Sequence, residues 1–157
     1  MFMKDVDIRK SYEKLREKYS NLPEYDEMNI NFELEYLDNE NLLCKTIRRR
    51  MNERLIFFCR VLEGILYPQN QINMYESGFF DEEKKNELSK FYRKLMILER
   101  KSLLLDVSCN EREDINHIIE LFNSWPEFKK IMSEVVIKLQ EIWKSEGKTE
   151  DNRGYFG

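Results

Sequence analysis

The longest stretch of regularly spaced apolar residues extends from Asp38 to Tyr67. Because its apolar residues recur every three or four positions, they share one side of an α-helix. From Leu55 onward other sides of this helix are apolar too, so it needs neighbours on several sides. Asp38 or Asn39 is expected to cap the helix, and Pro68 to end it. The inward positions are Cys44, Ile47, Met51, Leu55, Phe58, Leu62 and Ile65.

Four further segments repeat the helical spacing and carry start or stop signals. The last two are expected to lie within a residue or two of each other, because a proline suits the first turn of a helix. They are an N-terminal helix over Asp5–Asn21 that stops before Pro23, a helix capped by Asp81, a helix opened by the capping box Ser108–Glu111, and a helix opened by a second capping box, Ser124–Glu127.

Residues 29–37 break the helical pattern, because Ile30, Phe32, Leu34 and Tyr36 alternate with polar residues. Alternation with a period of two is typical of a strand with one covered face. No second run of this kind is present to pair with it, which leaves three interpretations: an extended arm over the helices, a strand paired across a dimer, or a short helix. We favour the extended arm. The segment 69–80 reads as a loop whose large apolar residues pack down.

Together these patterns predict an all-α fold, an antiparallel bundle of about five helices. It comprises a single helical domain over residues 1–147 with an extended arm around 29–37. A short polar C-terminal tail over residues 148–157 ends in Tyr-Phe-Gly.

The composition is typical of a folded soluble protein and bears on which partners it can bind. The chain has 157 residues, of which 41% are hydrophobic and 36% charged, as in folded soluble domains. Its net charge of −4 would repel nucleic acid or an anionic membrane, so such binding needs a local basic patch. The three isolated cysteines, and the absence of a signal peptide or a long uncharged run, favour a cytoplasmic protein that does not use a membrane.

Catalytic motifs are missing from the sequence. Its single histidine, His117, lies opposite the apolar stripe of its helix, so we expect it to be exposed. No nucleophile elbow, zinc-protease motif, phosphate-binding loop or dinucleotide fingerprint occurs. The sequence therefore predicts no catalytic residues, no metal and no cofactor, and a protein that is not an enzyme.

A basic cluster at the start of the central helix is the sharpest polar feature. Its members spread around the helix, so they cannot all face one ligand. Arg48 and Arg54 border the apolar stripe and are expected to pair with carboxylates such as Glu99, while Lys45 and Arg49 lie farther out. We favour internal pairing or solvation; contact with phosphates is the alternative. The cluster is Lys45, Arg48, Arg49, Arg50 and Arg54.

The C-terminal Tyr155, Phe156 and Gly157 follow a polar tether. Two adjacent aromatic residues on a tether resemble a docking peptide for a groove on another protein. A frayed end, or a tail that folds back on its own bundle, is an equal alternative.

These features favour a non-catalytic intracellular adaptor, which binds protein partners of unknown identity through its helical surface and aromatic tail, and which is a possible homodimer. The alternative is a nucleic-acid-associated protein, for example a replication- or ribosome-associated factor, that contacts phosphates through the basic cluster. An enzyme would require a closed pocket with convergent carboxylates.

Overall fold

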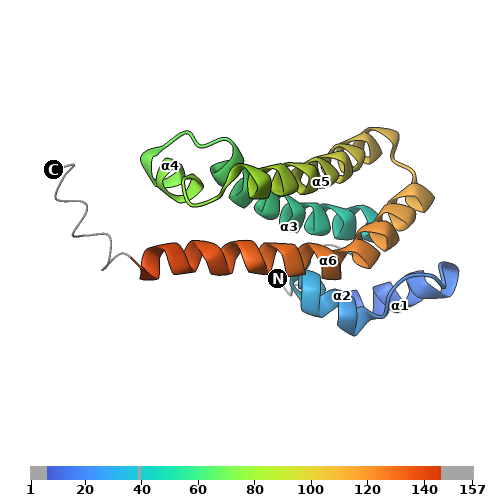
Figure 1. The fold of residues 1–157 in the computed structure, drawn as a ribbon. Helices are drawn as coiled ribbons and strands as arrows, with labels where there is room; N and C mark the ends of the chain where they lie inside the picture. The colour runs from blue at the N-terminus through green and yellow to red at the C-terminus, as the bar shows by residue number, and fades with distance from the viewer. Residues whose placement is uncertain (1–6, 39, 146–157) are drawn as a thin grey trace, which may run out of the picture.

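The computed structural model describes residues 7–38 and 40–145, which form helices joined by short connections (Figure 1). No strand occurs within these two ranges, so the all-α prediction is confirmed. In chain order the elements are α1 (Ile8–Lys18), α2 (Tyr25–Phe32), the 3-10 turn η1 (Leu34–Tyr36), α3 (Leu43–Leu66), α4 (Gln71–Ser77), α5 (Glu82–Ser108) and α6 (Glu111–Lys144).

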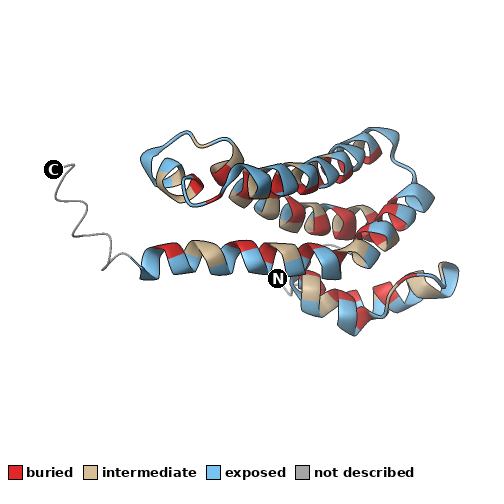
Figure 2. Ribbon diagram, viewed as in Figure 1, coloured by how far each residue is buried: buried red, intermediate tan, exposed pale blue. Residues whose placement is uncertain are grey.

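Helix α3 forms the centre of the bundle. It packs most extensively against α5 and next against α6, and the buried stripes of the long helices face one another (Figure 2). Leu55 and Leu62 in the middle of α3 are completely buried, as the spacing of apolar residues predicts. Full burial of one such side chain stabilises the fold by about 1.5–3 kcal/mol, so this stripe supplies much of the driving force for folding.

The expected extended arm over residues 29–37 is wrong. Residues up to Phe32 belong to α2, and η1 follows after Glu33, which adopts a left-handed conformation with φ 52°. Helical spacing explains the difference, because Tyr25, Met28 and Phe32 are three and four positions apart and are all buried. The alternating run overlaps this signal, but its Ile30 is 79% exposed and does not line a covered face.

The expected loop over residues 69–80 contains the short helix α4. Asn70 caps it by accepting a hydrogen bond from the backbone N–H of Asn73 at 2.8 Å. The Ser77 hydroxyl donates to the backbone carbonyl of Ile65 at 2.6 Å, and Phe80 is buried. The prediction that the large apolar residues of this segment pack down is correct only in part, because Phe80 is buried whereas Ile72, Met74 and Phe79 are exposed.

The two helices expected on either side of Pro126 are one continuous helix, α6. Ser124 thus lies inside a helix and is not a cap. A proline inside a helix lacks one backbone donor and bends the axis, and α6 changes direction along its length in Figure 1. The bend lets the first half of α6 cover the start of α3 while the second half follows the rest of the bundle.

Two of the expected caps are also wrong. Helix α3 starts at Leu43 after Leu42, which has φ 52° and makes no side-chain cap, so Asp38 is too far away to serve. Asn39 lies outside the described residues. At the start of α6 the cap is Asn110, which accepts from the backbone N–H of Glu113 at 3.1 Å. Asp81 does cap α5 as predicted, by accepting from the backbone N–H of Lys84 at 2.8 Å.

Candidate functional site: a basic cluster and an apolar groove

The basic cluster at the start of α3 is centred on a completely buried arginine, Arg48. Its Nε donates to Oδ1 of Asp114 on α6 at 2.7 Å, and its Nη2 donates to Asp106 on α5. Its Nη1 donates to the backbone carbonyl and to the hydroxyl of Ser102, at 2.8 and 2.6 Å. One guanidinium therefore joins α3, α5 and α6, and it is not available to an external ligand.

Three other arginines of the cluster are also paired. Arg49 donates through Nε to Asp106 at 3.2 Å, and Arg54 donates to Glu33 at the end of α2. Arg50 lies 3.9 Å from the same Glu33 carboxylate. The structure thus brings the cluster together with carboxylates from three other segments.

Lys45, the remaining member of the cluster, is half-buried and lies 3.9 Å from the sulfur of Cys109. The expected pairing of Glu99 with Arg48 or Arg54 is wrong, because Glu99 accepts from its neighbour Arg100. The prediction that Arg48 and Arg54 pair with carboxylates is nevertheless correct. Sequence spacing did not identify the partners because they lie on other elements.

The carboxyl group of Asp106 shows how strongly these charges are coupled. Desolvation by itself raises its pKa, but hydrogen bonds and charge interactions with Arg48 and Arg49 outweigh this effect and hold the pKa below its ordinary value. Asp106 is therefore ionised at neutral pH. Its charge therefore compensates those of Arg48 and Arg49.

His117 lies beside this network and is only 1% exposed, so the expectation that it is exposed is wrong. Neither ring nitrogen has a hydrogen-bond partner among the described residues. Burial, together with the charges of Lys101 and Arg48, lowers its pKa to about 4, although Glu120 acts in the opposite direction. The ring is therefore neutral at physiological pH.

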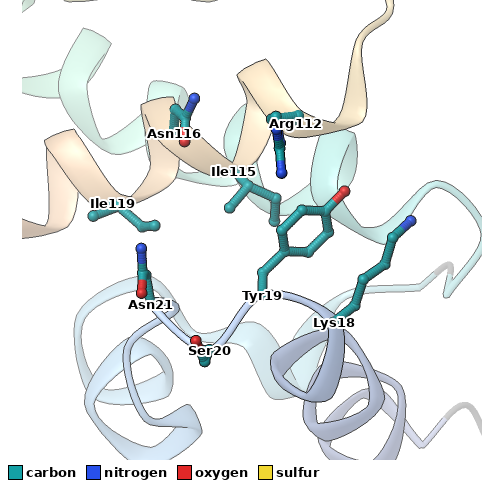
Figure 3. A pocket seen from close by; sticks show the side chains of 8 residues that line it. All are labelled: Lys18, Tyr19, Ser20, Asn21, Arg112, Ile115, Asn116 and Ile119. Carbon is teal, nitrogen blue, oxygen red and sulfur yellow. The ribbon is translucent and has the colours of Figure 1, made fainter.

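A polar cavity of about 350 Å³ lies between α6 and the connection from α1 to α2 (Figure 3). Ile115 and Ile119 on α6 point toward this connection, from which Tyr19 and Asn21 point back. The Lys18 ammonium and the Tyr19 hydroxyl both donate to Oε2 of Glu111, at 2.7 and 2.8 Å.

The hydrogen bond from Lys18 lowers the pKa of Glu111, and Glu111 in turn raises the pKa of Lys18. The two charges therefore satisfy each other, and neither is left for a ligand. Arg112 lines the cavity without an ion-pair partner among the described residues. A single exposed cation at the edge of an open cavity does not define a binding site.

An apolar groove of about 490 Å³ lies between α3 and the second half of α6. Three of its large apolar side chains are about half exposed, namely Phe57 at 59%, Ile137 at 53% and Val136 at 46%. Lys129 closes the end near α2, where its ammonium donates to the side-chain oxygen of Asn31 at 2.8 Å. The groove residues are Phe57, Phe58, Lys129, Met132, Ser133, Val136 and Ile137.

Sequence reasoning did not identify this groove as a site. The signal was present, because Phe57, Val136 and Ile137 lie off the buried stripes of their helices, where solvated polar residues are expected. A single helix cannot reveal a groove, however, since its two walls come from residues about 80 positions apart in the chain.

A second apolar surface lies on the outer face of α5. Ile97 is 69% exposed and Leu104 is 64% exposed, and Leu103 and Val107 are exposed beside them. Their spacing places them on one side of the helix, away from the buried residues Leu98 and Leu105. Ile97, at one end of this surface, also lines a cavity of about 200 Å³ between α5 and α6, smaller than the groove.

The described residues hold no group of three histidine, cysteine, aspartate or glutamate side chains that could bind a metal ion. Within the same part of the chain, no helix is both long and apolar enough to cross a membrane. Tyr155, Phe156 and Gly157 lie outside the described residues.

Comparisons with known proteins do not place the chain in a family: no family model matches it, and no curated protein or solved structure matches it at a significant level.

Proposed function

We propose that this chain is a non-catalytic protein-interaction module, and that the groove between α3 and α6 receives apolar side chains of a protein partner. The single observation that carries the proposal is the half-exposed set Phe57, Val136 and Ile137 around one concave surface. Contiguous exposed apolar surface is costly in water, and in folded proteins it marks binding sites. Grooves of this kind accept the apolar face of an amphipathic helix.

Nucleic-acid binding by the basic cluster is the less supported alternative. Arg48 is completely buried, and Arg49, Arg50 and Arg54 each lie near a carboxylate. Phosphate binding would have to compete with these internal pairs. A salt titration with mixed-sequence DNA and RNA tests the alternative, because phosphate contacts make the logarithm of affinity fall steeply with the logarithm of salt concentration.

The proposal is tested by affinity capture from the cell of origin with wild-type and substituted full-length chains. Ile137→Asp places a charge in the groove, whereas Leu104→Asp places the same charge on the outer face of α5. Both positions are more than half exposed, so we expect both variants to keep the wild-type melting temperature. A partner that binds the groove should bind Ile137→Asp about 30-fold more weakly, the effect of losing about 2 kcal/mol at an interface centre.

The matched pair makes the outcome specific. Loss of the partner in Ile137→Asp, with retention in Leu104→Asp, supports the groove as the interface. The reverse pattern assigns binding to α5 and removes the groove from the proposal. If the wild-type chain and both variants capture no partner at all, the proposed function is contradicted.

A further inference from the structure

The apolar groove lies close along the chain to a segment that carries two aromatic residues. Helix α6 contributes Met132, Val136 and Ile137 to the groove and ends at Lys144. With a rise of about 1.5 Å per residue, Ser145 lies about 12 Å along the helix from Ile137 and about 20 Å from Met132. Whatever follows Ser145 therefore starts within 20 Å or so of the groove.

The sequence after Ser145 has a length that suits this distance. Residues 146–154 separate it from Tyr155 and Phe156. A random coil of nine residues has an r.m.s. end-to-end distance of about 15–18 Å, and the same nine residues span about 30 Å when extended. Effective concentration is highest when the r.m.s. length of a tether matches the distance to be bridged, and it reaches the millimolar range for short tethers.

We propose that Tyr155 and Phe156 occupy the groove of their own chain, so that the groove is covered from within until a partner displaces them. The chemistry of the two surfaces is complementary. Aromatic side chains bury about 150–250 Å² each and pack well in offset or edge-on arrangements, for which Phe57 and Phe58 provide rings in one wall. Ser133 places a hydroxyl in the groove lining, a group that can accept a hydrogen bond from a phenol.

The end of the other exposed apolar surface that carries Leu104 and Val107 is out of reach for this segment. The α5 face includes Leu104 and Val107, near the end of α5 that leads into the start of α6. Helix α6 has 34 residues, so its far end lies roughly 50 Å from that point along the helix. Figure 1 accordingly shows the end of α5 and the end of α6 at opposite ends of the bundle. A nine-residue tether does not bridge this distance.

The regulatory consequence, competition between segment and partner, rests on the proposed function, whereas the docking itself does not. The experiment therefore measures docking in the full-length chain without a partner. Methyl-labelled wild-type protein is compared by NMR with a Tyr155→Ser/Phe156→Ser variant. We expect the methyl resonances of Val136, Ile137 and Met132 to shift, and those of Ile97 and Val107 to remain unchanged.

Direct contact is tested by nuclear Overhauser effects between the rings of Tyr155 or Phe156 and the methyl groups of Val136 and Ile137. Identical groove resonances in the two proteins, or ring contacts elsewhere, overturn the proposal. A partner captured by the groove would still support the proposed function in that case. Conversely, docking without any captured partner would leave this inference standing alone.

Changes in tether length and in protein concentration distinguish docking within one chain from docking by a second copy. Inserting 20 Gly/Ser residues after Gly147 lengthens the tether from nine to 29 residues, which should lower the ratio of docked to free states about six-fold if effective concentration falls as the −3/2 power of length. Docking within one chain leaves the groove resonances unchanged on dilution. Groove shifts that disappear on dilution would show docking by a second copy and overturn the inference.

Discussion

The Nε of Arg48 donates a hydrogen bond to Oδ1 of Asp114 over 2.7 Å, in a pair whose arginine is completely buried and whose aspartate side chain is 6% exposed. Removing two charges from water is costly, and their attraction offsets this cost only when the remaining donors are satisfied. Ser102 and Asp106 provide those further acceptors. The pair therefore depends on the whole network. Loss of Arg48 should weaken the packing of α3 against both α5 and α6.

Arg48→Ala should lower the free energy of unfolding by about 3–5 kcal/mol, because it leaves Asp114 buried without a counter-charge. Urea denaturation of the full-length chain measures this change. Arg48→Lys should recover only part of the loss, since an ammonium cannot reproduce the planar set of donors that reaches Asp114, Asp106 and Ser102 together.

The adjacent Arg49→Ala provides the control for this prediction. Arg49 is 56% exposed and shares Asp106 with Arg48, so its replacement should cost no more than about 1 kcal/mol. Equal losses for Arg48→Ala and Arg49→Ala would mean that burial of the Arg48 guanidinium does not determine its contribution.

His117 should make folding stability depend on pH in the mildly acidic range. Its pKa is lowered from 6.5 to about 4 in the folded chain, so the unfolded chain binds more protons between these values. The free energy of unfolding therefore keeps its full value above about pH 6.5 and falls as the pH approaches 4. A gap of this size corresponds to a loss of up to about 3 kcal/mol.

The His117→Leu variant isolates this contribution from that of the carboxylates, which also titrate at low pH. It should flatten the fall in stability between pH 6.5 and 4, as measured by urea denaturation at intervals of pH. It should also be as stable as the wild type at pH 7, because the leucine removes two ring nitrogens that have no partner among the described residues. An unchanged pH dependence would contradict a buried neutral imidazole.

Trp125 should be among the residues that contribute most to stability, because its ring joins three elements. It stacks on Phe58 of α3 with ring centres 4.8 Å apart and planes 9° apart, and it contacts Phe32 of α2 at 4.9 Å. Trp125→Ala should cost about 3–5 kcal/mol. Thermal unfolding measures this, with Trp143→Ala as the control.

Trp143 is 38% exposed and donates through Nε1 to Glu76 at 2.9 Å. Its replacement by alanine should cost no more than about half as much as Trp125→Ala, because much of its ring already contacts water. A larger effect at Trp143 would contradict this packing arrangement. A small effect at Trp125 would contradict the position of α2 against α3 and α6.

Leu42→Gly should stabilise the protein, although it removes an apolar side chain. Leu42 has φ 52° and its side chain is 76% exposed, so it carries the cost of a left-handed conformation and contributes little burial. Glycine adopts this conformation readily, and we expect a gain of up to about 1 kcal/mol. The control Ile30→Gly, exposed within α2, should instead destabilise by a similar amount.

The long helices could be predicted from the sequence because their buried stripes are continuous in the chain. The burial of Leu55 and Leu62 could be predicted without knowing which helices pack against them. The boundaries were less predictable, since Pro126 stops an isolated helix but is accommodated here by a bend within α6. The extended arm predicted for residues 29–37 was wrong because an alternating pattern concealed the helical spacing that started at Tyr25.

The candidate site was less accessible to sequence reasoning than the fold. The internal pairing of the basic cluster was anticipated, but Asp106 and Asp114 lie 58 and 66 positions from Arg48. His117 was expected to be exposed because it lies opposite the apolar stripe of its helix, and only that stripe was expected to be covered. Both α3 and α5 contribute charges near it, so more than one side of α6 is covered.

The contacts of Arg48 also constrain the order in which the chain can fold. They join segments 54 to 66 positions apart, so the closure of long loops must precede any favourable interaction of the guanidinium. Until α5 and the start of α6 reach α3, this side chain gains more from water. We therefore expect Arg48 to engage late, after the rate-limiting barrier, and its replacement to accelerate unfolding far more than it slows folding.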